Sequence, residues 1–400
     1  MLDYTIFGES HGPAVGVLVT GAAPGLPVDR EIIARELQRR APGGPLATAR
    51  HEPDRLHILS GVYQGFTTGD PICLVLENRD ARSGDYEALR NKPRPGHADY
   101  AAWVRSGGHN DPRGGGAYSG RLTAPLVAAG AMVKAWLKEQ DIQLTARVVD
   151  ESALRQQAAE AKAHGDSVGG EIACTVTGLP AGLGGPGWRE AVESELARHL
   201  FAIPAVKALG FGDGAALAHM RGSRANDPLR TDGVHVRTVT NHNGGINGGV
   251  TNGMPLTFTV TFKPTPSIAL PQDTVDLSRM ENCTVAVTGR HDPCIALRAA
   301  PIVEAAALAL WRVLDPRGGG LDTLRLRLDG IDRQLVGLLV RRQELSRDIG
   351  AYKAAHGLPV RDPEREAQVL RSRGDLAPEH RAEVERLYET LMALSREQQS

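Results

Sequence analysis

The sequence predicts a chain of two parts that differ in fold class, a front part of α+β or α/β type and an all-α tail. Strand-like and helical patterns alternate through about the first 320 residues. Those residues contain 41 of the 46 glycines and 22 of the 25 prolines. From Leu321 onward, leucines recur at spacings of three and four, as on one long helix. The segment 315–320, DPRGGG, suits a flexible linker, so we expect domains at 1–314 and 321–400.

Charge and cysteine content narrow the function classes. Because 46 basic residues are balanced by 47 acidic ones, the chain has no net positive charge that would attract nucleic acid or a membrane surface. Four scattered cysteines without a C-x-x-C pair fit reduced thiols in a cytoplasmic protein and argue against a metal site. No signal peptide is visible, and the longest apolar run, 122–133, is too short to span a bilayer. A small-molecule function is therefore expected.

The front part is expected to hold strands and helices in alternation. Short aliphatic runs bounded by glycine or proline predict strands at 15–20, 56–62 and 72–76. A period of two predicts half-buried strands at 172–176 and 256–262. Helical patterns cover 29–40, 122–138, 151–163, 188–200 and 295–314. Long glycine-rich loops separate these elements, and such loops in a compact domain are usually functional.

The stretch 96–121 is the most unusual of these loops. It is rich in glycine, carries two histidines and three arginines, and has too little aliphatic bulk for a core element. Glycines let backbone N–H groups approach a ligand, and arginine and histidine suit a phosphate or carboxylate. Polar loops at 8–12, 241–253, 263–267 and 290–294 have similar character. Each alone fits an ordinary surface loop, but together they predict a site for an anionic ligand.

The motifs in these loops resemble those of the chorismate synthase family. They read GESHG, RPGHADY, RGGG, GGINGGVTNG, KPTPS and GRHDPC, in this order, and the resemblance covers residues 1 to about 314. It implies a β-α-β sandwich that assembles as a homotetramer and binds reduced FMN, with NADPH as a candidate reductant. The implied reaction is the anti-1,4-elimination of phosphate from 5-enolpyruvylshikimate 3-phosphate, which gives chorismate in the shikimate pathway.

The resemblance also implies roles for single residues. His11 would be the acid near the leaving phosphate, His97 would stand by the flavin, and Asp292 would help to remove the substrate proton. The implied flavin-contacting residues are Ala117, Tyr118, Ser119, Pro204, Ala205, Gly248, Lys263, Pro264, Thr265, Pro266, Ser267 and Arg290. The implied substrate-binding residues are Ser10, Arg40, Arg50, Arg113 and Arg121.

The chain departs from the family pattern at three positions. Ala117 and Tyr118 stand where many members have an arginine and a serine. Leu46 stands where a further arginine is expected, and Arg50 is the candidate replacement.

The tail is expected to form three helices. The first runs from Leu321 to Lys353, which is roughly 48 Å at 1.5 Å per residue, so it needs another chain or long helix to pack against. Asp362 and Pro363 mark the start of the second helix, and the third follows Pro378. A coiled-coil dimerisation module is one interpretation. Arg342 argues against it, because a charge on the apolar seam costs several kcal/mol unless it is paired, which favours an external anion.

The tail resembles the all-helical chorismate mutase family along its whole length. The matching stretches are LRLRLDGIDRQLVGLLVRRQELSRDIGAYK and LPVRDPERE. The resemblance implies a Claisen rearrangement of chorismate to prephenate, which needs two clamped carboxylates and a donor on the ether oxygen. The implied site residues are Arg325, Arg342 and Arg365 for the carboxylates, Lys353 and Gln399 for the ether oxygen, Glu366 for the ring hydroxyl, and Asp362 and Ser395.

Together the two resemblances imply a bifunctional enzyme in which the product of the front part is the substrate of the tail. Two alternatives remain open from the sequence. The tail could be a non-catalytic module that dimerises or senses chorismate. The front part could bind flavin without catalysis, as an assembly protein.

Overall fold

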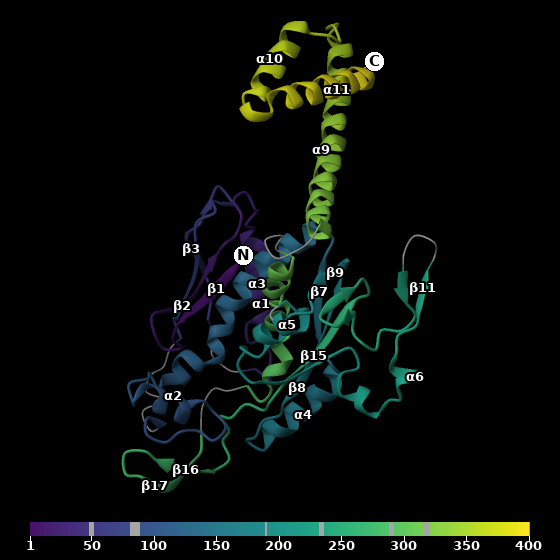
Figure 1. Cartoon of the computed structure of the whole chain (residues 1–400). Helices are drawn as coiled ribbons and strands as arrows, with labels where there is room; N and C mark the ends of the chain where they lie inside the picture. Colours follow the sequence, from purple (N-terminus) through teal and green to yellow (C-terminus); the bar gives the residue numbers. More distant parts are fainter. Residues whose placement is uncertain are drawn as a thin grey trace. The chain divides into compact units, whose positions relative to one another are not determined.

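The computed structural model describes residues 1–47, 52–80, 89–188, 190–231, 236–287, 292–314 and 321–399. Side chains at 321–327, 329–331, 333–334 and 399 lie outside that description, as does the expected linker at 315–320. The chain divides into two compact units, Met1–Leu324 and Arg325–Ser400. Figure 1 labels many of the helices and strands of both units.

Two four-stranded antiparallel sheets frame the first unit (Figure 1). The first sheet has the order β1 (Asp3–Gly8), β2 (Ala14–Thr20), β6 (Ile72–Glu77) and β3 (Leu56–Ser60). The second has the order β10 (Val206–Phe211), β15 (Leu256–Phe262), β8 (Gly170–Thr177) and β7 (Gln143–Val148).

Strand β15 shows why these segments pair in the observed register. Its residues alternate between buried and half-buried, so that Leu256, Phe258, Val260 and Phe262 face the core. Phe258 lies opposite Cys174 of β8, which alternates in the same way. The predicted strands at 172–176 and 256–262 are therefore confirmed, because the period of two sets which face of the sheet is buried.

Helices fill the space between the two sheets. The layer consists of α1 (Arg30–Arg40), α3 (Thr123–Glu139), α7 (Ala300–Glu304) and α8 (Ala307–Val313). Helix α3 contacts β2 and β6 of the first sheet and β7 of the second, while α7 contacts β7 and β8. Almost all of α3 is buried, as its uninterrupted apolar run requires. The front part is thus the β-α-β sandwich that the resemblance implied.

Smaller elements carry the loops around this frame. They are β4 (Val62–Tyr63), β5 (Phe66–Thr67), α2 (Asp99–Ser106), α4 (Glu151–Ala163), β9 (Ala181–Gly184), α5 (Val192–Leu200), α6 (Gly222–Ala225), β11 (Leu229–Thr231), β12 (Val236–Thr238), β13 (Ile246–Asn247), β14 (Val250–Asn252), β16 (Gln272–Asp276) and β17 (Glu281–Val285).

Two predicted helices differ from the structure. The helix expected at 188–200 begins at Val192, because a turn in which Glu190 and Ala191 both donate to the Gly187 carbonyl precedes it. The helix expected at 295–314 is divided into a 3₁₀ turn at Ile295–Arg298, then α7 and α8. Pro301 explains the first division, since proline has no N–H and is tolerated only in the first turn of a helix.

The second unit contains α9 (Leu321–Ala355) from Arg325 onward, α10 (Pro363–Gly374) and α11 (Arg381–Gln399), and α10 packs against α11. Asp362 caps α10 through a 3.0 Å hydrogen bond from the Arg365 N–H, which confirms the predicted start of this helix. The third helix begins after a 3₁₀ turn at Pro378–His380. Within the described chain, no helix is both long and apolar enough to cross a membrane.

Helix α9 keeps an apolar face exposed in the single chain. Leu335 is 52% exposed, Leu345 63% and Tyr352 60%, although all three belong to the predicted seam. Leu328 lies seven residues before Leu335, Leu338 lies seven before Leu345, and Ile349 lies fourteen after Leu335 with Arg342 midway. These three side chains are exposed as well. A contiguous apolar stripe of this kind is typical of a surface that another helix covers.

Candidate active sites

A pocket of about 630 Å³ lies in the first unit and gathers residues from loops that are distant in the sequence. Its size is within the range typical of small-molecule sites. The predicted site residues that line it are Ser10, Arg40, His97, Ala117, Tyr118, Ser119, Arg121, Pro204, Ala205, Lys263, Thr265, Pro266, Ser267 and Asp292.

Some predicted residues do not line this pocket. His11 lies against Gly114, which is a lining residue, and Pro264 lies in sequence between the lining residues Lys263 and Thr265. Arg113 is partly exposed and pairs with Asp111 at 2.8 Å. Gly248 lies in the tight turn that joins β13 to β14. The predictions for Arg50 and Arg290 fall outside the described residues.

The RGGG turn brings the two predicted catalytic histidines to one place. Gly114 and Gly115 have φ angles of 60° and 94°, which favour glycine. A Cβ atom at Gly114 would lie 2.4 Å from the ring of His11, and one at Gly115 would lie 2.8 Å from the ring of His97. The Ser10 N–H donates to the Gly116 carbonyl at 3.1 Å and fixes the first loop against this turn. Only residues without a side chain let both rings approach so closely.

A half-buried carboxylate, that of Asp99, holds the His97 ring. Its Nδ1 atom lies 2.5 Å from Asp99 Oδ1, and Arg94 donates to the same carboxylate from Nε at 2.7 Å and from Nη2 at 2.9 Å. Burial alone would raise the pKa of the Asp99 carboxyl. Hydrogen bonds from Arg94 and His97 outweigh it and hold that pKa well below its usual range. Asp99 is therefore an ionised acceptor at neutral pH.

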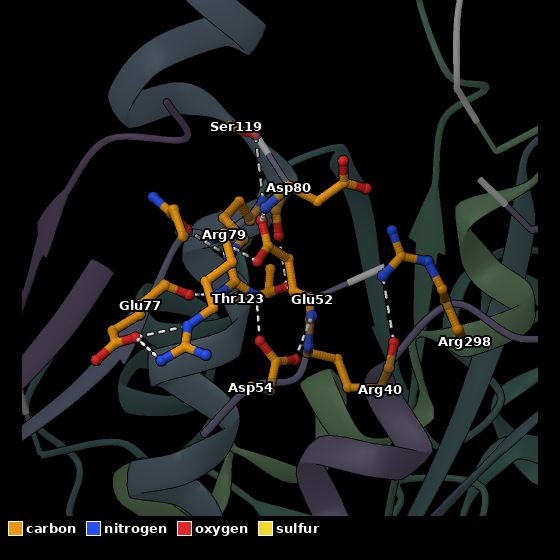
Figure 2. A network of polar contacts seen from close by, with 12 residues as sticks. Arg40, Glu52, Asp54, Glu77, Arg79, Asp80, Ser119, Thr123 and Arg298 are labelled. Carbon is orange, nitrogen blue, oxygen red and sulfur yellow. Dashed lines mark hydrogen bonds and ion pairs between the residues drawn. The ribbon is translucent and has the colours of Figure 1, made fainter. Parts of the chain in front are cut away.

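Three arginines converge on another wall of the pocket. Arg40 and Arg121 both bind the Asp54 carboxylate, Arg40 at 3.0 Å. The side chains of Arg40, Arg121 and Asp54 are at most 6% exposed. Arg298 donates to Asp292 at 2.7 Å and, as Figure 2 shows, to the backbone carbonyl of Arg40 at 3.2 Å. Two carboxylates thus face three guanidinium groups.

This arginine cluster has unused capacity for an anion. Burial, together with Arg298 and Arg121, lowers the pKa of Arg40 to about 10, although Asp54 opposes the shift. The Nε atoms of Arg40 and Arg298 are buried and have no hydrogen-bond partner among the described residues. Buried donors of this kind are normally satisfied, so a ligand carrying acceptor oxygens, such as a phosphate or carboxylate, fits here.

Residues around the pocket also fit a flavin mononucleotide. The Thr265 hydroxyl is buried and finds no hydrogen-bond partner in the described part of the chain. Burial and the neighbouring Lys207 lower the pKa of Lys263. Tyr118 and Phe201, which are 40% and 51% exposed, present aromatic surface to the pocket. Ala117 lines the pocket beside Tyr118.

In the second unit, Arg342 and Ser395 meet directly. Arg342 donates to Ser395 and, at 2.8 Å, to the Leu391 carbonyl, and Ser346 donates to Ser395 at 3.1 Å. Arg342 is half-buried, and these hydrogen bonds already pair its guanidinium group in part within the single chain. The structure therefore supplies neutral partners for this charge that the seam pattern did not indicate.

The other predicted tail residues lie around α10. Lys353 donates to the Val360 carbonyl at 2.7 Å, and Arg365 to Gln368 at 2.5 Å. Glu366 accepts from Arg396 at 2.6 Å. The side chains of Arg325 and Gln399 fall outside the described set.

Sequence reasoning missed several residues of these sites. Arg94 and Asp99 stand inside the RPGHADY motif, three residues before and two after His97, and that spacing could have indicated them. Ser346 follows Arg342 by one helical turn. Nothing in the local sequence pattern marks Asp54 or Arg298, because their partners lie elsewhere in the chain.

Comparison with known proteins identifies a family for each part of the chain. The profile of the chorismate synthase family matches residues 2–314, and that of chorismate mutase type II matches residues 324–400. The chain is 47% identical over 332 residues to a chorismate synthase of Thermococcus kodakarensis, covering 76% of this chain and 93% of that protein. It is 48% identical over 333 residues to a chorismate synthase of Aeropyrum pernix, covering 75% of this chain and 87% of the relative.

A solved structure supports the fold. A crystal structure of chorismate synthase superimposes with a TM-score of 0.63 at 25% identity, covering 83% of this chain and 98% of the other. The family matches thus define an enzyme of the shikimate pathway. The chain belongs to the chorismate synthase family, and a chorismate mutase type II domain follows the synthase domain.

Proposed function

We propose that this chain is a bifunctional enzyme that makes chorismate in the first unit and converts it to prephenate in the second. The observation that carries the synthase half is one pocket lined by His97 and a cluster of three arginines, with His11 against the lining residue Gly114. The substrate, 5-enolpyruvylshikimate 3-phosphate, carries a phosphate and carboxylates, which is the chemistry that such a cluster binds.

Each residue has a defined task in the proposed anti-1,4-elimination. Arg40, Arg121 and Arg298 stabilise negative charge as the C–O bond breaks and the phosphate leaves with the bonding electrons. His11 is the acid near that phosphate, and Asp292, held by Arg298, helps to remove the proton whose C–H bond breaks.

The proposed cofactor is reduced FMN. Lys263 and Thr265 would hold its phosphate, and Tyr118 would contact its ring system. When bound, reduced FMN supplies transient electron density and recovers it, so the reaction has no net redox change. NADPH is the proposed source of the reducing electrons, and a flavin-reduction assay without any other reductase would test whether the chain uses it directly.

Anaerobic assays of phosphate release test the synthase half. Phosphate release should require reduced FMN without consuming reductant in proportion to product. Arg121→Ala should abolish it, whereas Arg155→Ala, which removes an exposed arginine of α4, should not. Equal turnover with oxidised FMN would refute the proposal. Flavin binding without any phosphate release would favour a non-catalytic assembly protein instead.

The mutase half rests on the meeting of Arg342 with Ser395 and of Glu366 with Arg396. In the proposed site the arginines clamp the carboxylates of chorismate, and Lys353 and Gln399 donate to the ether oxygen. Added chorismate should disappear and prephenate should form. Arg342→Ala should lose this activity, whereas Arg347→Ala, on an exposed position of the same helix, should keep it. Chorismate binding without conversion would favour a sensing module.

The proposed assembly is a cytoplasmic homotetramer in which the tails form dimers. The exposed seam of α9 supports tail pairing, because burying about six large apolar side chains against a second copy is strongly favourable. Mass measurement in solution tests this. A monomer at micromolar concentration would contradict both the tetramer and the paired tails.

A further inference from the structure

We propose that Arg94 and Asp99 are positioning residues that fix the tautomer of His97, so that the neutral ring carries its proton on Nδ1 and turns the unprotonated Nε2 toward the pocket. The inference deepens the proposed synthase function and rests on it for the part that concerns turnover. It needs only residues that the structure describes.

The hydrogen bonds around Asp99 dictate the tautomer. An ionised carboxylate accepts hydrogen bonds and cannot donate one. The 2.5 Å contact between Asp99 Oδ1 and His97 Nδ1 therefore places the proton on Nδ1. Arg94 Nη2 also lies 3.2 Å from Nδ1 and 3.5 Å from Nε2, but it already donates to Asp99 Oδ1 at 2.9 Å, so the shorter contact with the carboxylate decides the tautomer. The opposite edge of the ring lies against the glycine turn, where a Cβ atom at Gly115 would meet Nε2 at 3.0 Å. His97 itself is one of the residues that line the pocket.

Arg94 keeps the carboxylate in place. Its backbone N–H and Nε donate to Asp99 Oδ2 at 3.0 Å and 2.7 Å, and Nη2 donates to Oδ1 at 2.9 Å. Its remaining terminal nitrogen, Nη1, donates to the hydroxyl of Ser267 at 3.0 Å. Arg94 is 6% exposed, so these bonds are shielded from water. A series of hydrogen bonds thus connects Ser267 of the proposed flavin loop to His97 through Arg94 and Asp99.

This arrangement has a chemical consequence for the neutral ring. With the proton on Nδ1, the ring offers an acceptor to the pocket and can take a proton there. With the proton on Nε2 it would offer a donor instead. A carboxylate that orients a histidine in this way usually decides whether the histidine can act as a base.

Asp99→Asn provides a sharp test, because the variant keeps the shape of the side chain and changes which atoms can accept. Two Arg94 donors point at Oδ2 and one at Oδ1, so the amide oxygen should take the Oδ2 place. Its NH₂ group then faces His97 Nδ1, which can accept only if it has lost its proton. The variant should therefore move the proton of the neutral ring to Nε2.

Nitrogen NMR of the flavin-free, ¹⁵N-histidine-labelled protein reads the tautomer directly, with His97→Gln used to assign the signals. At mildly alkaline pH, the wild type should show a protonated Nδ1 and an unprotonated Nε2. Asp99→Asn should exchange these two signatures and lower phosphate release about 10²- to 10⁴-fold. Asp150→Asn should leave both unchanged, because it alters a carboxylate at the start of another helix, α4.

Two outcomes would overturn the inference: a wild-type ring protonated on Nε2, or an Asp99→Asn ring with the wild-type signature. The wild-type measurement needs no variant, so the inference stays testable if Asp99→Asn does not fold. Arg94→Lys should lower stability but keep the proton on Nδ1, since Asp99 remains a carboxylate. If the wild type releases no phosphate, the proposed function fails while the tautomer result stands separately.

Discussion

Replacing Asp54 by Asn should destabilise the first unit and make it more dependent on anions. Asp54 has a φ angle of 45°, a left-handed conformation that asparagine tolerates well, so the variant removes the charge without adding backbone strain. It leaves Arg40 and Arg121, both 4% exposed at the side chain, without their shared carboxylate.

The expected size of the effect follows from burial. Removing one partner of a buried ion pair typically costs about 3–5 kcal/mol. For the unit Met1–Leu324, an unfolding entropy of about 2.1 cal/mol/K per residue makes 1 kcal/mol equal to roughly 1.5 °C. Asp54→Asn should therefore lower the melting temperature of this unit by about 4–7 °C.

Thermal melts of the full chain with and without inorganic phosphate measure both effects. Phosphate should raise the melting temperature of Asp54→Asn more than that of the wild type, because an anion bound to the native state stabilises it and can replace the missing carboxylate. The matched control is Glu151→Gln, which breaks an exposed pair with Arg155 and should shift the melt by less than about 1 °C. A wild-type melting temperature for Asp54→Asn, or an equal response to phosphate, would refute this reasoning.

Three further predictions address the two sites and the core. His11→Ala and His97→Ala should each lower phosphate release about 10²- to 10⁴-fold and leave prephenate formation intact; normal release by both would remove their catalytic roles. Burial lowers the pKa of His199 to about 3, and Arg198 and Arg312 add to that shift. The unfolded state therefore binds a proton that the folded state does not, so stability should fall by about 2 kcal/mol from pH 7 to pH 5. The melting temperature of His199→Asn should depend less steeply on pH over that interval, and an unchanged slope would contradict the assignment. We expect each mutase site to combine Arg342 of one chain with Arg325 of its dimer partner. Arg325→Ala and Arg342→Ala should then each be nearly inactive as mutases. Refolding a mixture of the two should recover about a quarter of wild-type activity, because about half of the dimers are mixed and each of these keeps one site with both arginines. No recovery in confirmed heterodimers would place both arginines in one chain's site.

Local patterns in the sequence predicted local structure well. The alternation at 256–262 indicated a half-buried strand, and the Asp362–Pro363 pair indicated the start of α10, because each signal depends on neighbouring residues only. The composition change near residue 320 indicated a change in fold class in the same way. The motif order identified the loops of the candidate site, since glycine, histidine and arginine reveal their chemistry wherever the chain places them.

Partners far apart in the sequence were decided by the tertiary structure alone. Arg94 bonds to Ser267 and Arg121 to Asp54, pairs that no periodicity connects. Of the two divisions in the helix predicted at 295–314, Pro301 marks the first locally, whereas nothing in the sequence marks the break between α7 and α8. The sequence by itself thus determined which elements and reactive groups the chain contains. Folding decided which guanidinium meets which carboxylate, since burial makes such a pairing necessary and only the packed layers bring the partners within reach.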